Sequence, residues 1–265
     1  MGSLPESRPC TNFVLDSLSP QAKNPLVMRN TLLTSLPFAQ RAVSRSKRGS
    51  DGSAANRLFD ATVVLCASEG FQVTVRDIAA LAKTNLAAIN YYYQSKDNLL
   101  QLVIEASAKP INEMMISQLT AYEDFVGGGK LDVSHVWSAL AAPLIRCSMD
   151  ESSWYSDRAR IYIRAALYAS PPWAESPGMT EIDAIAKRFI KALSGALPGL
   201  SPDEVKWRFY FGWGTILTAT RDTYDNSRFR RVSKGACNTS NLDELLKRLV
   251  AFLTNATCKC SETNK

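Results

Sequence analysis

The side chains best suited to a chemical task lie between Thr74 and Lys96, where polar and aromatic residues flank a short turn. Thr74 and Asp77 have the spacing of a capping box that begins one helix, and Asn85 is placed to cap a second. The turn Lys83–Thr84 joins them. Paired helices of this kind insert the second helix into the major groove of DNA while the first spans the backbone. The stretch therefore predicts a helix-turn-helix.

The second helix of this pair is expected to bury Leu86 and Ile89 and to turn its other side outward. Its outward residues are expected to be Ala87, Ala88, Asn90 and Tyr91. No Lys or Arg occurs from residue 85 to residue 93, so base reading would rest on asparagines, tyrosines and alanine contacts with thymine methyls. Asn pairs bidentately with adenine, which favours a half-site containing A/T pairs.

These residues carry a resemblance to a known family. Arg76-Asp77-Ile78-Ala79, Ile89, Tyr92-Tyr93 and Ser95-Lys96 resemble the DNA-binding signature of the TetR family of bacterial transcriptional regulators, over about Ala54 to Leu102. The stretch from Asn85 to Tyr91 is similar to the subset that includes fatty-acid-responsive PsrA-type and CecR-type regulators. Most members have Gly where this chain has Lys83; Gly adopts positive φ freely, so this turn is either strained or follows another path.

The resemblance implies a sequence-specific regulator, by family expectation a repressor, that a small molecule releases from its operator. It also implies that Tyr92 and Lys96 contact phosphates, which position a protein without reading sequence. Residues expected to contact DNA are Thr74, Arg76, Thr84, Asn85, Ala87, Ala88, Asn90, Tyr91, Tyr92 and Lys96. Tyr93 is expected to pack inside the head instead.

Helical periodicity predicts an all-α chain, because no region alternates with period two for long enough to be a strand. The architecture expected is an N-terminal three-helix helix-turn-helix head followed by a C-terminal helical bundle for ligand binding and dimerisation. Beyond the head, the helices expected are 98–107, 111–125 after a break at Pro110, 132–149 with a kink at Pro143, 154–169, 180–196, 202–224 and 242–256.

Charge and composition divide the chain into four parts. Residues 1–50 hold seven basic and two acidic residues, a net charge of +5, and the total of +6 leaves +1 for the rest. We expect a disordered basic arm at 1–50, the DNA-binding domain at 51–102, the ligand-binding and dimerisation domain at 103–258 and a polar tail at 259–265. The arm either contacts the DNA backbone or is a solvated leader. It also resembles an organelle transit peptide. A simpler hypothesis than a transit peptide is that translation starts at Met28 or later.

The helix predicted at 202–224 is apolar around almost its full circumference, so it must be buried on all sides. With the helix at 242–256, it predicts a four-helix interface in a homodimer, with Gly212 and Gly214 allowing close approach. The alternative is a wholly intramolecular core. An operator with two symmetric half-sites also requires a dimer.

A small hydrophobic effector, acyl-type as a first hypothesis, is the partner expected in the C-terminal body. An arginine at 146, 158, 160 or 164 could pair its anionic group, and the alternative for every lining residue is plain core. The candidate lining residues are Trp137, Leu140, Leu144, Tyr155, Tyr162, Ile163, Leu167, Trp213 and Leu217.

Other functional classes have little support in the sequence. No apolar run is long enough to cross a bilayer, so no membrane partner is expected, and the pattern of cysteines leaves a reduced, cytoplasmic location as the default expectation. Six scattered cysteines and the single His135 give no metal-ligand frame, and no catalytic set or cofactor motif is evident. Redox sensing through Cys258 and Cys260, an enzyme, and a TetR-like interaction protein that has lost operator binding are the alternatives.

Overall fold

A computed structural model describes residues 53–168, 177–224 and 228–258 of the chain. These ranges contain helices and no strand, which confirms the all-α class. The chain divides into two compact units, Met1–Ser53 and Ala54–Lys265, and the second is described below. The predicted basic arm (1–50) and polar tail (259–265) lie outside the described residues.

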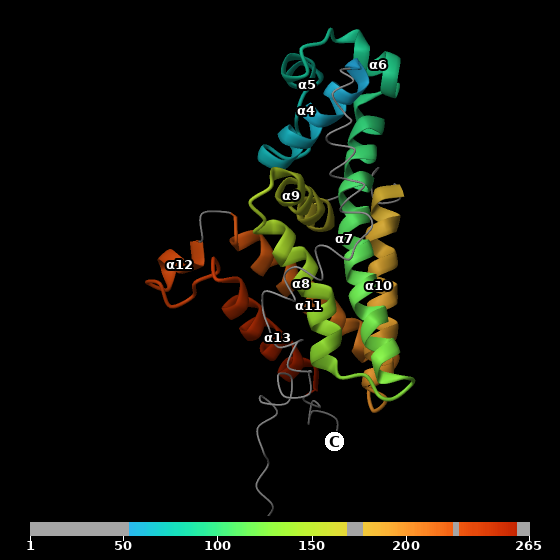
Figure 1. The fold of residues 1–265 in the computed structure, drawn as a ribbon, viewed down its shortest axis with the longest axis vertical. Helices are drawn as coiled ribbons and strands as arrows, with labels where there is room; N and C mark the ends of the chain where they lie inside the picture. Colours follow the sequence, from blue (N-terminus) through green and yellow to red (C-terminus); the bar gives the residue numbers. More distant parts are fainter. Residues whose placement is uncertain (1–52, 169–176, 225–227, 259–265) are drawn as a thin grey trace, which may run out of the picture. The chain divides into compact units, whose positions relative to one another are not determined.

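Three short helices form the N-terminal part of this unit: α4 (Ala54–Ser68), α5 (Val75–Leu81) and α6 (Ala87–Tyr93). They pack on one another, and α4 and α6 also pack on α7 (Lys96–Val126) (Figure 1). Leu58, Ile78, Ile89 and Leu99, one from each helix, are fully buried. The predicted three-helix head is therefore confirmed, and its core is a single apolar cluster shared with α7.

The predicted break at Pro110 is wrong. Helix α7 runs without interruption for 31 residues, with Pro110 inside it, and ends at Gly127, whose φ is 60°. Proline removes one backbone hydrogen bond, but α7 is flanked by α8, α9 and α10, and both Ala108 and Ile111 beside the proline are fully buried. Tertiary packing thus outweighs the local preference. The helix also crosses the predicted domain boundary between residues 102 and 103.

The remaining helices build the body. They are α8 (Val133–Ser148), α9 (Ser153–Tyr168), α10 (Pro177–Ala196), α11 (Pro202–Asp222), α12 (Arg228–Val232) and α13 (Leu242–Cys258). Four of the predicted helices are confirmed to within two residues at each end. Helix α10 begins three residues before Thr180, which was expected to cap it, and α12 was not predicted. Helix α8 continues through Pro143.

Within one chain, α11 and α13 are not buried on all sides. Val205, Phe209 and Ile216 of α11 face the core, whereas Trp207 and Phe211 are 59% and 63% exposed. The two glycines also differ. A Cβ atom at position 212 would lie 2.4 Å from the ring of Trp137, whereas one at position 214 would meet nothing within 4 Å. Gly212 therefore permits a close approach within the chain, which corrects the expectation that both glycines serve an interface between chains.

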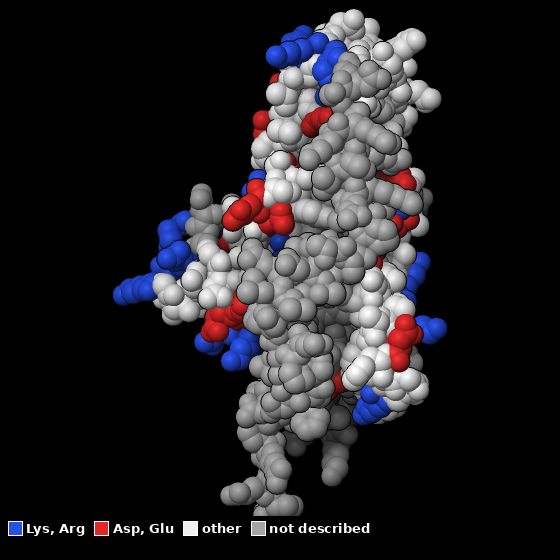
Figure 2. All heavy atoms as spheres, viewed as in Figure 1, with Lys and Arg blue, Asp and Glu red and all other residues white. Residues whose placement is uncertain are grey.

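Basic side chains on the described body are concentrated at α12. Arg228, Arg230, Arg231 and Lys234, in and just after α12, are all exposed, and Figure 2 shows basic side chains collected over α12. The net charge of +1 for residues 51–265 conceals this local concentration. The sequence had indicated that the basic charge lies in the N-terminal arm. The residues of α12 show that the body also carries a basic segment.

The described ranges contain neither a candidate membrane span nor a candidate metal site. Among their helices, none combines the length and the apolar character that a membrane crossing requires. The same ranges hold no group of three or more His, Cys, Asp or Glu side chains arranged to bind a metal ion.

Candidate nucleic-acid interface

The first helix of the pair, α5, begins with the predicted capping box. The Thr74 hydroxyl accepts a hydrogen bond from the Asp77 backbone N–H at 3.2 Å, and the Asp77 carboxylate accepts one from the Thr74 N–H at 3.0 Å. The Thr74 hydroxyl also donates to this carboxylate, which lowers the pKa of Asp77. The box fixes where α5 starts and leaves Arg76 exposed in its first turn.

The sequence allowed two alternatives for the turn at Lys83, a strained backbone or a different path. The structure shows the strained backbone. Lys83 has a φ of 52°, in the left-handed region that glycine occupies freely. Two hydrogen bonds hold the turn: Thr84 N–H donates to the Ala79 carbonyl at 3.0 Å, and Arg57 Nε of α4 donates to the Ala82 carbonyl at 3.0 Å. The contact with Arg57, 25 residues away, had no local signal in the sequence.

The second helix, α6, is capped by Asn85, whose side-chain oxygen accepts a hydrogen bond from the Ala88 N–H at 2.9 Å. Its inward side differs from the prediction. Ile89 is fully buried as expected, but Ala88 is 9% exposed rather than outward, and Leu86 is 50% exposed rather than inward. The inward face is centred between Ala88 and Ile89 because α6 packs on both α4 and α7.

The outward side of α6 presents Ala87, Asn90 and Tyr91, which helical spacing places on one face. Tyr91 is 82% exposed, and its ring meets that of Tyr92 edge to face at 4.8 Å between centroids. Helix α6 is seven residues long and carries no charged side chain. Together with the neighbouring Tyr92, this face can offer one amide, two phenols and a methyl group to base edges.

Residues flanking α6 hold it in place. The Tyr93 hydroxyl donates to the Ala55 carbonyl at 2.8 Å, which confirms the expectation that this side chain packs within the head. The Ser95 hydroxyl accepts from the Asn98 N–H and caps α7. Lys96 Nζ donates to the Val73 carbonyl at 3.1 Å, so this lysine fastens the loop before α5.

Most of the predicted DNA-contacting residues lie on the solvent side of the head. Two do not: Ala88 is buried, and the Thr84 hydroxyl is shielded from solvent and has no hydrogen-bond partner among the described residues. Leu86, which the sequence assigned to the core, is exposed beside α6 instead. The exposed residues are Thr74, Arg76, Asn85, Ala87, Asn90, Tyr91 and Tyr92, and Lys96 is partly buried.

Two family models match this chain. The model for bacterial regulatory proteins of the tetR family matches residues 58–103, which span α4, α5, α6 and the start of α7. The model for the tetracyclin repressor-like C-terminal domain matches residues 138–256. Together they cover more than half of the chain.

The chain belongs to the TetR family. The fold agrees: a tetR family protein of known structure from Shewanella sp. PV-4, assigned as a transcription regulator, has a TM-score of 0.52 and 14% identity, over 77% of this chain and 97% of that one. A transcriptional regulator from Rhodococcus sp. Rha1 aligns with a TM-score of 0.49 and 19% identity, over the same shares. A comparison with curated proteins finds no match.

The residues predicted to line an effector site separate into two groups. Leu167, Trp213 and Leu217 line a hollow of about 770 Å³ between α9 and α11, together with Tyr210 and Phe211. The others lie deeper. Trp137, Leu140, Leu144, Tyr162 and Ile163 are buried in the core, and Tyr155 is partly buried.

One of the buried residues has an unmet hydrogen-bonding need. The Tyr162 hydroxyl is fully buried, has no hydrogen-bond partner among the described residues, and its burial raises its pKa. Its ring meets Trp213, a residue of the hollow, edge to face at 6.2 Å. An unpartnered buried hydroxyl costs free energy unless another group reaches it.

Proposed function

We propose that this TetR-family regulator binds an operator through the exposed face of α6. The observation that carries the proposal is the combination of outward-facing Ala87, Asn90 and Tyr91 with a capped, cross-braced turn that holds them rigidly. Base readout needs side chains positioned on a stable element. Arg76 and Lys83, exposed beside this face, would supply the phosphate attraction that α6 lacks.

The test is a gel shift at low salt with the full chain and the DNA upstream of its own gene. A discrete complex that resists unrelated competitor DNA supports the proposal. Absence of any sequence-preferring complex would instead favour the alternative, a TetR-fold interaction protein without operator binding. The strained Lys83 and the uncharged recognition helix are the features that favour that alternative.

We further propose that the operator-binding form is a homodimer joined through α11 and α13. Trp207, Tyr210 and Phe211 of α11 and Phe252 of α13 are 59–66% exposed, an unusual cost for four aromatic side chains in water. Tyr210, Phe211 and Gly214 also line the hollow between α9 and α11, so a partner chain seated on this face would border the effector site. Two copies would pair these faces symmetrically, and the paired heads would then meet two half-sites of the operator.

The effector proposed is a small hydrophobic molecule in the hollow lined by Leu167, Trp213 and Leu217, with an acyl chain as the first class to test. Such a ligand would lie beside Trp213 and approach the unpartnered Tyr162 hydroxyl. The resemblance to the PsrA-type and CecR-type subset is the reason for choosing acyl compounds. Repression, with release by the ligand, is the mode of regulation proposed, in the cytoplasm where the operator lies.

A thermal-shift screen of fatty acids and acyl-CoA thioesters, followed by operator-release assays, tests this effector. A ligand that raises the melting temperature should do so less in Ala166→Phe, where a ring would fill part of the hollow. Lack of any response across the panel would contradict the acyl assignment without affecting operator binding.

A further inference from the structure

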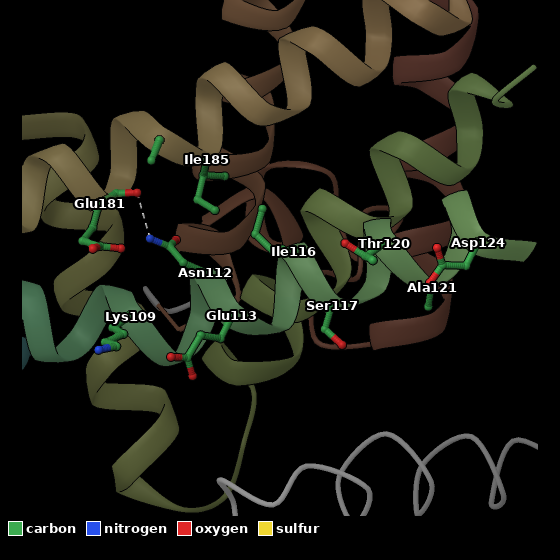
Figure 3. Close-up of a pocket in the computed structure, with 11 residues that line it drawn as sticks. Lys109, Asn112, Glu113, Ile116, Ser117, Thr120, Ala121, Asp124, Glu181 and Ile185 are labelled. Carbon is green, nitrogen blue, oxygen red and sulfur yellow. Dashed lines mark hydrogen bonds between the residues drawn. The ribbon is translucent and has the colours of Figure 1, made fainter. Parts of the chain in front are cut away.

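A second hollow lies on the body, between α7 and α10, away from the head and from the hollow described above. These helices run side by side (Figure 1). The hollow has a volume of about 630 Å³. Figure 3 shows its lining, which includes Lys109, Glu113, Asp124 and Glu181 together with the apolar Ile116 and Ile185.

A buried amide with an unmet acceptor lies in this lining. Asn112 is 4% exposed and reaches from α7 toward α10, where its Nδ2 donates to the Glu181 carbonyl at 3.0 Å (Figure 3). That bond fixes the orientation of the amide, because only the nitrogen can donate. The Oδ1 atom is buried without a hydrogen-bond partner among the described residues. A donor that reached this acceptor would remove the cost of leaving it unpaired, and a bound ligand is one source of such a donor.

The charged side chains around Asn112 indicate what kind of ligand could donate to its Oδ1 atom. Three carboxylates and one lysine line the hollow, and among the described residues Glu113, Asp124 and Glu181 form no ion pair. Glu123 nearby is already paired with Arg188 of α10. The lining thus has an excess of negative charge, which favours a positively charged N–H donor.

The carboxylates of the hollow are too far apart to bind one compact cation, such as a metal ion, together. Within the described ranges no three acidic side chains lie close enough to hold a metal ion. Glu113 and Asp124 are eleven residues apart on one helix, about three turns, so they share a face at a separation of about 16 Å. The lining between them is mixed: it includes the apolar Ile116 of α7 and Ile185 of α10 as well as the hydroxyl side chains of Ser117 and Thr120.

We propose that this hollow binds a linear aliphatic polyamine. One ammonium group donates to Asn112 Oδ1 and lies near Glu113 and Glu181, the methylene chain covers Ile116 and Ile185, and a distal ammonium lies near Asp124. The site is separate from the DNA-binding face and from the proposed acyl site, so its occupancy adds a second input to the body of the regulator.

Calorimetric titration of the full chain with spermine, in the absence of DNA, tests the proposal. Spermine is expected to bind saturably and more tightly than putrescine or Mg²⁺, because only the longer cation spans both ends of the hollow. Glu113→Gln and Asn112→Leu are each expected to weaken spermine binding by about tenfold or more, since each removes a partner of a charged donor. Glu105→Gln, an acidic residue on the same helix that does not line the hollow, is the matched control and should bind like the wild type.

Two results would overturn the proposal: no saturable binding of spermine, or equal binding by wild type, Glu113→Gln and Glu105→Gln, which would indicate general attraction to acidic residues. Glu113 is exposed, so its variant folds even if Asn112→Leu does not. Because no DNA is present, failure here leaves the operator-binding proposal unaffected.

Discussion

Asn90 is the exposed residue of α6 whose side chain can pair bidentately with a base, so the specificity of the head should depend on it. Replacing Asn90 with Ala is expected to weaken binding to the preferred operator by about 1–3 kcal/mol and to relax preference at one base pair in each half-site. Fluorescence anisotropy with a set of single-base operator variants measures both effects.

The matched control for Asn90→Ala is Gln118→Ala, which removes an amide from α7 outside the head. It should bind every operator variant like the wild type. If Asn90→Ala does the same, the base-reading role assigned to Asn90 is incorrect.

The cysteines provide a second test at the residue scale. Burial raises the pKa of Cys66 and of Cys147 to about 12, whereas Cys237 and Cys258 are exposed. Alkylation needs the thiolate, which at pH 8 would be about one part in ten thousand for the buried pair. Brief treatment of the native protein with iodoacetamide, read by peptide mass spectrometry, should label Cys237 and spare Cys66. Equal labelling of the two would show that the head opens far more readily than its packing implies.

At the scale of the helix, how much could be predicted depended on whether the signal was local. The capping box at Thr74 was readable because cap and partner lie three residues apart. The inward face of α6 was not, because it depends on how α4 and α7 meet that helix. Pro110 was misjudged for the same reason: the helices packed on α7 hold it together where the sequence predicted a break.

In the candidate site, too, features with a local sequence signal could be predicted and features that depend on tertiary contacts could not. The helix-turn-helix and most of its exposed residues could be read from motif spacing. Sequence periodicity carries no information about several other features. The hydrogen bonds from Arg57 to the turn, from Lys96 to Val73 and from Asn112 to Glu181 join residues 23 to 69 positions apart. The unpartnered oxygen of Asn112 depends on burial, which is also a tertiary property.

The two central glycines of α11 offer a matched pair of substitutions. Gly212→Ala would place a methyl group against the Trp137 ring and is expected to destabilise the protein by about 1–3 kcal/mol. Gly214→Ala meets open space and should be neutral or stabilising by up to about 1 kcal/mol in the monomer. Urea denaturation of both variants measures the difference. Equal stability would mean that Trp137 does not lie against α11 as described.

At the scale of the whole molecule, the exposed aromatic face on α11 and α13 predicts the oligomeric state. Phe211→Glu is expected to convert the dimer to a monomer, because it places a charge at the centre of the proposed interface. Sedimentation velocity measures this directly. Phe125→Glu, at the end of α7 where Phe125 is 77% exposed, is the control and should leave the dimer intact. A wild-type chain that sediments as a monomer at micromolar concentration would contradict the interface.

The presentation of α6 to the major groove is tested most directly by footprinting the wild-type protein on the DNA fragment that it prefers, with hydroxyl radicals and with major-groove methylation interference. We predict two symmetric protected patches centred about one helical turn or a multiple apart, with methylation inside each patch blocking binding, and loss of both patterns when Ala87, Asn90 and Tyr91 are replaced together. A footprint that persists unchanged in that triple variant, or no preferred fragment at all at low salt, would contradict it.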